Sequence, residues 1–362
     1  MACGRGLTDE QARASCLGEA AELASACFRG SEALLRASWR DVDGQAVHPA
    51  SLVLASEAQL RNRDKWNAVH GAFDWLPARF DETLPVDWVE ATSPDGSDRA
   101  LVPAACVYIG YFEQEDEKAF AIADSSGCAA GATMEEASIS AFLELVERDA
   151  VSIWWYGGHA RPALSPGAVG GTADLVAVLK ARARTLHLLD LTTDLGIPVC
   201  AAVSAEPGGD AVAVGTAAHF DVGRAAAAAL TEMLQAEFSI ALRTRMAPLD
   251  DRDAFGFWLR RVSFPSMPYL LPSGKSLRPA GPAGEPTVSE CIRVCREAGL
   301  RFLAVDLTRP EIGVPVVRAI VPGMRPLRRR LAAGRLFDVP VRLGWQERRM
   351  SAAEMNLVPM TA

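Results

Sequence analysis

The sequence predicts a mixed α/β (α+β) fold built from pseudo-symmetric units, each of one helix followed by two strands. Two observations carry this prediction. One helical pattern of small residues and carboxylates occurs three times, and the stretches DLTTDLGIPV (190–199) and DLTRPEIGVPV (306–316) are near-duplicates. The copies are too far apart and too unevenly spaced for a stacked solenoid. We therefore expect equivalent elements of one domain that covers residues 1–362, with three helices converging on a shared centre.

Composition and charge exclude several classes of protein. Of the 362 residues, 49% are apolar and 23% are charged, and the formal net charge is −8. The chain has no apolar run long enough to span a membrane and no leader of the secretory type. Its negative balance argues against a nucleic-acid surface. Eight Cys without framework spacing indicate a reducing, cytoplasmic setting, and Cys291 with Cys295 is more typical of a half-buried helix face than of a zinc site.

The most informative stretch runs from Asp124 to Trp155. A loop of small residues leads to Thr133, and Glu136 follows three residues later, which is the pattern of a reciprocal helix cap. No Gly or Pro interrupts the chain from there to Trp155, so the stretch predicts a helix of several turns. At about 100° per residue, one narrow face of this helix carries four polar side chains: Glu136, Ser140, Glu144 and Glu147.

The same pattern precedes and follows this helix. Each copy opens with a capping residue behind a glycine-containing loop, and each places polar residues at matched positions. The copies are Thr8, Ala12, Ser15, Glu19 and Glu22; Thr133, Ala137, Ser140, Glu144 and Glu147; and Asp221, Ala225, Ala228, Glu232 and Gln235. Taken singly, such a face is explained equally well as a solvated acidic surface. The threefold recurrence favours a site.

Converging carboxylates indicate a nucleotide–magnesium site. Mg²⁺ takes oxygen ligands and usually also phosphate oxygens, and helix N-termini behind glycine loops supply N–H groups for phosphates. We expect Glu19, Glu144 and Glu232 to approach one common point. No GxxxxGK[ST] motif is present, and no nucleophile, triad or His-based metal motif occurs, so no catalytic side chain is assigned.

The rest of the chain is taken in order. Residues 31–100 are interpreted as an irregular strand-and-turn connector whose tryptophans serve packing, and 101–113 as a strand feeding the central loop. A helix is expected at about 172–185, three strands between 188 and 219, a loop over 264–286, and a helix at 287–299 followed by two strands. The stretch from Arg325 to Arg349, with eight Arg against two acids, is interpreted as a solvated tail.

These stretches together resemble the YcaO family, and within it the azoline-forming cyclodehydratases of ribosomally made peptide natural products. The matching stretches lie in order and cover nearly the whole chain: 4–22, 124–155, 188–199, 229–235, 305–324 and 334–345. The resemblance implies binding of ATP with Mg²⁺. It also implies an activity in which a Cys, Ser or Thr side chain of a precursor peptide attacks the preceding carbonyl, and the amide oxygen is phosphorylated and lost.

The resemblance also implies roles for individual residues. The metal ligands expected from it are Glu19, Glu22, Glu144, Glu147 and Glu232. Nucleotide contacts are expected from Arg5, Ser15, Glu136, Ser140, Arg148, Arg224, Gln235 and Arg318. Of these, Arg5 stands where the family has Lys, and Arg224 lies one turn before a position where the family has Arg.

The chain departs from the family pattern at several positions. Leu23 and Ala228 stand where Arg is typical, and Ala132 stands where Asn is typical. Only a trace of the family's proline-rich C-terminal tail is present, at Asn356, Pro359 and Met360. These departures keep three hypotheses open: an active cyclodehydratase, a relative that makes a thioamide or macroamidine, and a non-catalytic scaffold.

The resemblance implies partners as well. The chain opens almost at its first repeat, and nothing in it resembles a separate leader-binding domain. We therefore expect the ribosomal precursor peptide to be held by a ThiF-like leader-binding protein. Further expectations are an azoline dehydrogenase where the rings are oxidised, and assembly as a homodimer or a hetero-complex.

Overall fold

The computed structural model describes residues 4, 6, 8–113, 116–164, 177, 182–246, 254–274 and 286–360. These residues form two compact units, and each is described by itself. The first comprises Met1–Arg148, Pro286–Pro326 and Arg330–Arg335, and the second comprises Asp149–Glu285, Leu327–Arg329 and Leu336–Ala362. Helix α6 (Met134–Gly157) therefore contributes residues to both.

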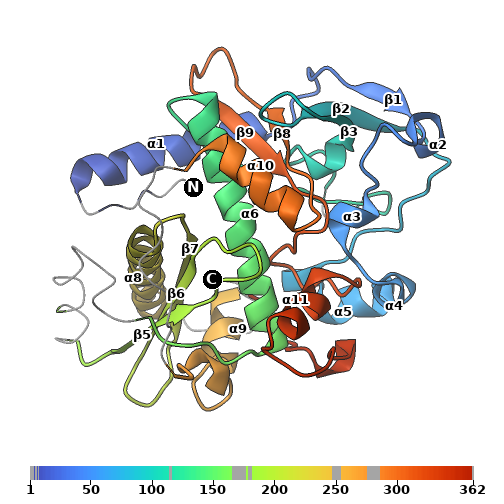
Figure 1. The fold of residues 1–362 in the computed structure, drawn as a ribbon. Coiled ribbons are helices and arrows are strands. Elements are labelled where there is room, and N and C mark those ends of the chain that lie inside the picture. Colours follow the sequence, from blue (N-terminus) through green and yellow to red (C-terminus); the bar gives the residue numbers. More distant parts are fainter. Residues whose placement is uncertain are drawn as a thin grey trace. The chain divides into compact units, whose positions relative to one another are not determined.

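The first unit is organised on an antiparallel sheet in the order β1-β2-β8-β9-β4, with β3 paired to β2 (Figure 1). Helix α1 packs against β4 and β9. The strands are β1 (Leu35–Ala37), β2 (Val86–Thr92), β3 (Arg99–Pro103), β4 (Cys128–Ala130), β8 (Leu303–Asp306) and β9 (Val316–Ile320). Its helices, besides the first part of α6, are α1 (Asp9–Ala26), α2 (Trp39–Val42), α3 (Ala50–Val53), α4 (Glu57–Arg61), α5 (Arg63–Asp74) and α10 (Val288–Glu297), with a 3-10 turn η1 (Ala104–Cys106).

The second unit is organised on the antiparallel sheet β5-β6-β7, against which α8 packs (Figure 1). The strands are β5 (Thr185–Asp190), β6 (Val199–Ala205) and β7 (Ala213–Ala218). The helices, besides the last part of α6, are α8 (Val222–Met246), α9 (Ala254–Arg261) and α11 (Arg335–Arg342, from Leu336 on), with 3-10 turns η3 (Pro268–Leu270) and η4 (Ala352–Glu354). Gly215 on β7 allows the close packing, because a Cβ there would lie 2.4 Å from the carbonyl oxygen of Ala229 on α8.

The two near-duplicate stretches have the same local structure. The N–H of Thr192 donates to Asp190 Oδ1 at 3.0 Å, and the N–H of Thr308 donates to Asp306 Oδ1 at 2.8 Å. Each threonine Oγ1 then accepts the N–H of the residue that opens the next strand, Val199 at 3.3 Å or Val316 at 3.1 Å. In each unit one strand leads directly into a long helix, β4 into α6 in the first and β7 into α8 in the second. The predicted pseudo-symmetry is confirmed for these elements.

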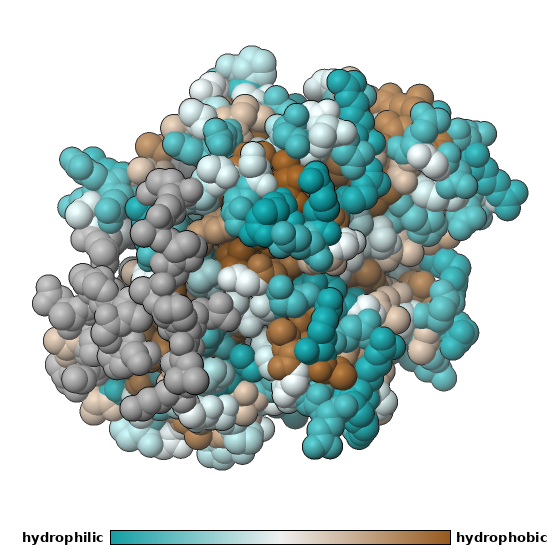
Figure 2. Space-filling model, viewed as in Figure 1, coloured by the Kyte–Doolittle hydropathy of each residue, from teal (hydrophilic) through white to brown (hydrophobic). Residues whose placement is uncertain are grey.

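Helix α10 shows why the cysteine pair has helical spacing. Thr287 caps the helix by accepting the N–H of Glu290 at 3.2 Å. Cys291 and Cys295 are fully buried rather than half-buried, and burial raises the pKa of each thiol to about 12. Arg293 pairs with Glu290 and Glu297 on the opposite, hydrophilic face, which Figure 2 shows in teal. The pair is packing, as expected.

The connector predicted for residues 31–100 is wrong in part, because it contains four helices, α2 to α5. Three of them have five residues or fewer, too short for an apolar period, and side-chain caps fix the starts of two. Ser56, for example, accepts the N–H of Gln59 at 3.2 Å, and Gln59 Oε1 accepts the N–H of Ser56 at 3.1 Å. The prediction that the tryptophans serve packing is confirmed for Trp75 and Trp88, which are buried.

Three further predictions differ from the structure or lie outside it. The strand expected over 101–113 ends at Pro103, where η1 begins, because Pro103 cannot continue a ladder as a donor. The helix expected at 172–185 lies mostly outside the described residues, and residue 185 already belongs to β5. Of the loop at 264–286, residues 268–270 form η3, and 275–285 lie outside the described residues.

The prediction of a solvated arginine-rich tail is wrong in part. It is confirmed for Arg348 and Arg349, which are exposed and pair with Glu354 and Asp338. It is wrong for the first part of the stretch. Arg325, Arg329, Arg330 and Arg335 are all buried. Arg330 pairs with Asp74 Oδ1 at 2.7 Å and donates to the carbonyl of Trp75 at 2.6 Å, and Arg329 donates to the carbonyl of Leu357 at 2.8 Å. The charge run was misleading because Arg329 and Arg330 bind backbone carbonyls and a distant carboxylate rather than neighbouring acids. Among the described residues, no helix is long and apolar enough to cross a membrane.

The Arg330–Asp74 pair yields a stability prediction. Both side chains are almost completely buried, at 4% and 1% exposure. Arg330→Ala would leave a buried carboxylate without its cation, and we expect it to lower the free energy of unfolding by about 3–5 kcal/mol. Urea denaturation measures this. Arg293→Ala, at an exposed triad on α10, serves as control and should cost under about 1 kcal/mol; equal losses in the two variants would contradict the assignment.

Candidate nucleotide and magnesium site

The helices of the first unit that carry the predicted site begin at threonine caps. Thr8 accepts the N–H of Gln11 at 3.2 Å at the start of α1, and Thr133 accepts the N–H of Glu136 at 3.1 Å at the start of α6. The Glu136 carboxylate accepts the N–H of Ala132 at 3.0 Å. The predicted cap is therefore present, with the reciprocal bond displaced by one residue. Glu136 serves the helix start in this structure.

Glu144 links α6 to the loop before it. Its Oε2 accepts the N–H of Gly127 at 3.1 Å, and its Oε1 accepts from Arg148 Nη2 at 3.1 Å. Arg148 also lies 3.3 Å from Glu147, which is buried. The Glu144 side chain is only 23% exposed, and this burial raises its pKa, with Arg148 opposing the shift. Two predicted metal ligands and one predicted nucleotide contact thus form one network.

The loop approaches α6 closely only because residue 127 is glycine. Gly127 has a φ of +76°, which side-chain-bearing residues rarely adopt. A Cβ there would lie 2.9 Å from Leu145 Cδ2 and 3.1 Å from the carbonyl oxygen of Ala319. The small residues of this loop are evident in the sequence, but the hydrogen bond from the N–H of Gly127 to Glu144 was not predicted. The sequence feature that could have indicated this close approach is the glycine at position 127, since glycine is the residue that allows it.

Arg318 holds the same loop from the other side. This residue on β9 is 3% exposed. Its Nη2 and Nη1 donate to the carbonyls of Asp124 and Ser126, each at 2.6 Å, and its Nε donates to the carbonyl of Val107 at 3.1 Å. The predicted nucleotide contact is therefore a positioning residue in this structure. Its charge also acts on the site, because it opposes the rise in the pKa of Glu22.

The pKa of Glu22 is raised as well. Burial, Glu144 and Glu19 raise its pKa to about 8, while Arg318 and Arg148 oppose the shift. Glu22 is therefore near enough to Glu144 and to Glu19 for its charge to be repelled by theirs. Cys128 lies near the same carboxyls and is buried, and burial raises the pKa of its thiol to about 12. This cysteine was not among the predicted site residues. Ser15 is partly buried on α1, and Ser140 is exposed on α6.

A cavity of about 410 Å³ lies between α1 and the loop before α6. Small residues line it: Ala14, Leu17, Gly18, Ala130, Gly131, Ala132, Gly313, Val314 and Pro315. The N–H of Gly131 donates to the carbonyl of Pro315 at 3.0 Å, which closes one end of this wall. The cavity places open space beside the N-terminus of α6, where an anionic group is stabilised by free N–H groups and the helix dipole.

The remaining predicted site residues lie on α8 in the second unit. Asp221 caps α8 by accepting the N–H of Arg224 at 2.8 Å, and its own N–H donates to His219 Nδ1 at 2.9 Å. Glu232 and Gln235 follow on α8 and are partly buried. Because each unit is described by itself, the approach of Glu232 to Glu19 and Glu144 stays a prediction. Arg5 lies outside the described residues.

The carboxylates of the first unit fit a magnesium ion that takes only part of its coordination from protein. Among the residues that the structure describes, no three His, Cys, Asp or Glu side chains form a ready metal cluster. Mg²⁺ commonly binds through one or two carboxylates, with waters and phosphates completing the octahedron. Burial raises the pKa of Glu22 most, followed by the charge of Glu144 and then of Glu19, and a divalent cation bound beside these carboxyls would favour their ionised forms.

The C-terminal residues are anchored within the second unit, which the sequence analysis did not predict. Asn356 Nδ2 donates to Tyr269 Oη at 2.9 Å, and its N–H donates to the carbonyl of Tyr156 at 2.8 Å. Trp155 Nε1 donates to the carbonyl of Val358 at 2.8 Å. The tail is thus tied to the last turns of α6 by the partly buried Asn356 and by two aromatic side chains, although little of the family's proline-rich pattern remains.

Comparison with known proteins identifies the family. The chain matches the YcaO family, described as ATP- and Mg²⁺-binding cyclodehydratases, over residues 3–325. It superposes on a heterocyclase in complex with substrate and cofactor with a TM-score of 0.89 and 36% identity, covering 99% of this chain and 49% of that one. It superposes on the heterocyclase TruD with a TM-score of 0.80 and 34% identity, covering 97% and 50%.

A third solved structure carries the predicted ligands. A YcaO protein from Methanopyrus kandleri, bound with AMPPCP and Mg²⁺, matches with a TM-score of 0.63 and 26% identity, covering 89% of this chain and 78% of that one. The chain therefore belongs to the YcaO family of ATP- and Mg²⁺-binding proteins, as the resemblance implied. It spans about half the length of the two heterocyclases.

The pKa of Glu22 predicts how stability depends on pH in metal-free protein. The folded-state pKa of about 8 exceeds the ordinary value of 4.5, so the folded state prefers the protonated carboxyl. This contribution to stability is present below about pH 4.5 and is lost as the pH rises through about 8. We expect urea midpoints, measured with EDTA, to fall over this interval in wild type.

The matched variants isolate this carboxyl. Glu22→Gln cannot ionise and should remove that part of the pH dependence, whereas the exposed control Glu117→Gln should keep it. If Glu22→Gln and wild type lose stability in parallel between pH 5 and 8, Glu22 is not the titrating group.

Proposed function

We propose that this chain uses ATP and Mg²⁺ to convert Cys, Ser or Thr residues of a ribosomal precursor peptide into thiazoline or oxazoline rings. The observation that carries the proposal is the carboxyl cluster of Glu19, Glu22 and Glu144 beside the loop at 124–127, in a chain that is similar over its length to two heterocyclases. We treat both units as parts of one YcaO domain over residues 1–362.

The roles of the residues follow from charge and position. Glu19, Glu22 and Glu144 of the first unit, with Glu147 and with Glu232 of the second, would supply oxygen ligands to Mg²⁺. Arg148 lies between Glu144 and Glu147 and would balance charge when phosphates are present. The free N–H groups at the start of α6, and Ser15, Ser140, Arg224 and Gln235, would contact the nucleotide. Arg318 would keep the loop in place.

The protein's part in such a reaction is orientation and neutralisation of charge. Bound Mg²⁺–ATP supplies a phosphoryl group that turns the amide oxygen of the peptide into a leaving group. The ring closes on a side chain of the peptide itself, which is consistent with the lack of a nucleophile motif in this sequence. Each ring formed removes one water from the peptide.

We further propose that a ThiF-like protein holds the leader of the precursor and delivers its core to this chain. Binding through a partner raises the local concentration of the core peptide. We include in this proposal an azoline dehydrogenase that oxidises the rings, and assembly of the chain as a homodimer or a hetero-complex. A cytoplasmic location is also part of this proposal, and it is supported by the seven described cysteines, which are thiols rather than disulfides.

The test is peptide mass in a reconstituted reaction. With precursor, partner and Mg²⁺–ATP, wild type should remove one water per ring, and without the partner it should remove little or none. Glu144→Gln keeps the shape of the side chain but removes its charge, and we expect it to lower the rate at least a hundredfold, as observed when a charged contact in a preorganised site is removed. The exposed control Glu117→Gln should react at the wild-type rate.

Each contrary result has a defined meaning. An exchange of oxygen for sulfur, or ring closure by the peptide N-terminus, would replace the azoline assignment by a thioamide or a macroamidine. If the reaction with Glu144→Gln removes water at the wild-type rate, this chain is a scaffold and the proposed activity is wrong.

A further inference from the structure

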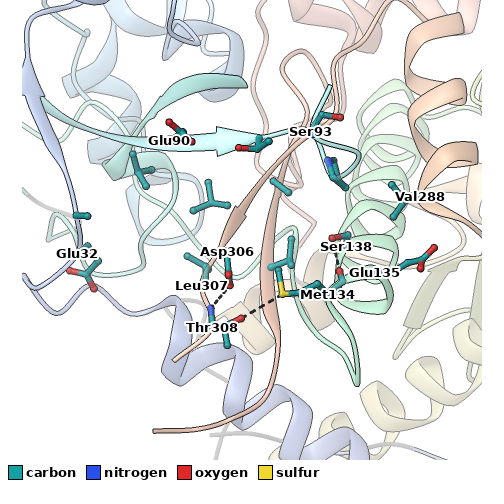
Figure 3. A pocket seen from close by; sticks show the side chains of 18 of the residues that line it. Glu32, Glu90, Ser93, Met134, Glu135, Ser138, Val288, Asp306, Leu307 and Thr308 are labelled. Atoms are coloured by element: carbon teal, nitrogen blue, oxygen red, sulfur yellow. Dashed lines mark hydrogen bonds between the residues drawn. The ribbon is translucent and has the colours of Figure 1, made fainter. Parts of the chain in front are cut away.

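The first unit has a second and larger cavity, of about 840 Å³, within its sheet. Figure 3 shows it between Glu90 on β2, Asp306 at the end of β8, and Met134, Glu135 and Ser138 on the first turns of α6. Glu32 and Ala33, just before β1, close the remaining side. The volume lies in the range typical of ligand pockets. None of the predicted nucleotide or metal residues lines it.

This cavity exists because the sheet pairing is interrupted. One edge of β2 pairs with β1 from Val86 to Trp88, and the same edge pairs with β8 only at Thr92 and Ala304. Continuing that register would place Glu90 directly opposite Asp306. Two carboxylates at directly opposed positions destabilise a strand pair. The strands diverge there, and we call the opening the fork pocket.

Both strands direct backbone polar groups into the fork pocket. Leu101 on β3 uses its backbone N–H and C=O for hydrogen bonds to Gln45 and Val47, on the side away from β2. Glu90 on β2 lies opposite Leu101, so these two residues form a non-hydrogen-bonded pair of the β2–β3 ladder. The N–H and C=O of Glu90 therefore point to the other edge of β2. The N–H of Leu307, just after β8, donates to the carbonyl of Val316 on β9. Because successive residues of a strand alternate in direction, the N–H and C=O of Asp306 face away from β9.

The walls of the fork pocket are apolar, and carboxylates make its rim negatively charged. Val89, Val305 and Leu307 are buried parts of the wall. Glu32 is neutralised by Arg309 at 2.7 Å. Glu90, at 63% side-chain exposure, has only a long contact of 3.9 Å to Arg99, and both Glu135 and Asp306 are exposed. Phosphates and nucleic acids are disfavoured here, and a cation on an aliphatic stem is favoured.

We propose that the fork pocket binds an extended segment of the peptide substrate, with an arginine or lysine side chain seated between Glu90 and Asp306. The assignment of a peptide substrate rests on the proposed function. Open strand edges recognise extended peptides through backbone hydrogen bonds, and pockets for single side chains supply specificity. The carboxylates that stop the sheet from closing are thus the groups that select the cation.

The test uses the whole chain and two synthetic probes, without ATP or partner. One is a fluorescein-labelled ten-residue peptide of alternating Ser and Val with a central Arg, and the other carries citrulline, the neutral isostere of arginine, at that place. Fluorescence anisotropy should show binding of the Arg peptide and at least tenfold weaker binding of the citrulline peptide. The double variant E90Q/D306N should bind the Arg peptide as weakly as wild type binds citrulline.

The control variant D64N/E117Q removes the same charge from exposed positions outside the fork pocket and should bind like wild type. Equal affinity of wild type for both probes, or equal affinity of E90Q/D306N and wild type for the Arg peptide, would overturn the proposal. So would concentration-dependent dimerisation that E90Q/D306N abolishes, since the occupant would then be a second copy. The comparison of the two probes on wild type needs no variant. Its result does not depend on water loss in the reconstituted reaction, so the two proposals can fail separately.

Discussion

The candidate site depends on how one buried guanidinium holds a loop. Arg318 donates to three backbone carbonyls, at Asp124, Ser126 and Val107, and so fixes the course of the chain into β4 and α6. This course brings the N–H of Gly127 to Glu144 and leaves the N-terminus of α6 beside the smaller cavity. Lysine would keep the charge at position 318 but could not make this planar set of contacts.

Around that fixed loop, the structure concentrates carboxyls that repel one another. Glu22 shares its field with Glu19 and Glu144, and only Arg148 and Arg318 oppose the rise of its pKa. Such an arrangement is costly in an empty site and favourable once a divalent cation arrives. The fork pocket shows the same physics at a smaller scale, because Glu90 and Asp306 stop a strand ladder and thereby create a place for a cation.

The sequence predicted the elements that local chemistry determines. The cap at Thr133, the uninterrupted helix after it and the duplicated DLT turns were visible because each depends on residues within a few positions of one another. The four helices among residues 31–100 were missed because short capped helices have no apolar period. The burial of Arg329 and Arg330 was missed because their partners, Leu357 and Asp74, are distant in sequence or are backbone atoms. The role of Arg318 as a loop clamp was hidden for the same reason.

The central claim is that the carboxyl cluster holds the magnesium that accompanies ATP. Calorimetric titration of the chain with Mg²⁺–AMPPCP near pH 7, in Tris and in HEPES, tests it most directly, because the two buffers differ in ionisation enthalpy. With a pKa of about 8, Glu22 is protonated in the free chain, so wild type should release close to one proton more on binding than Glu22→Gln does. Binding with the same proton release in both proteins, or unchanged affinity in Glu144→Gln, would contradict the account.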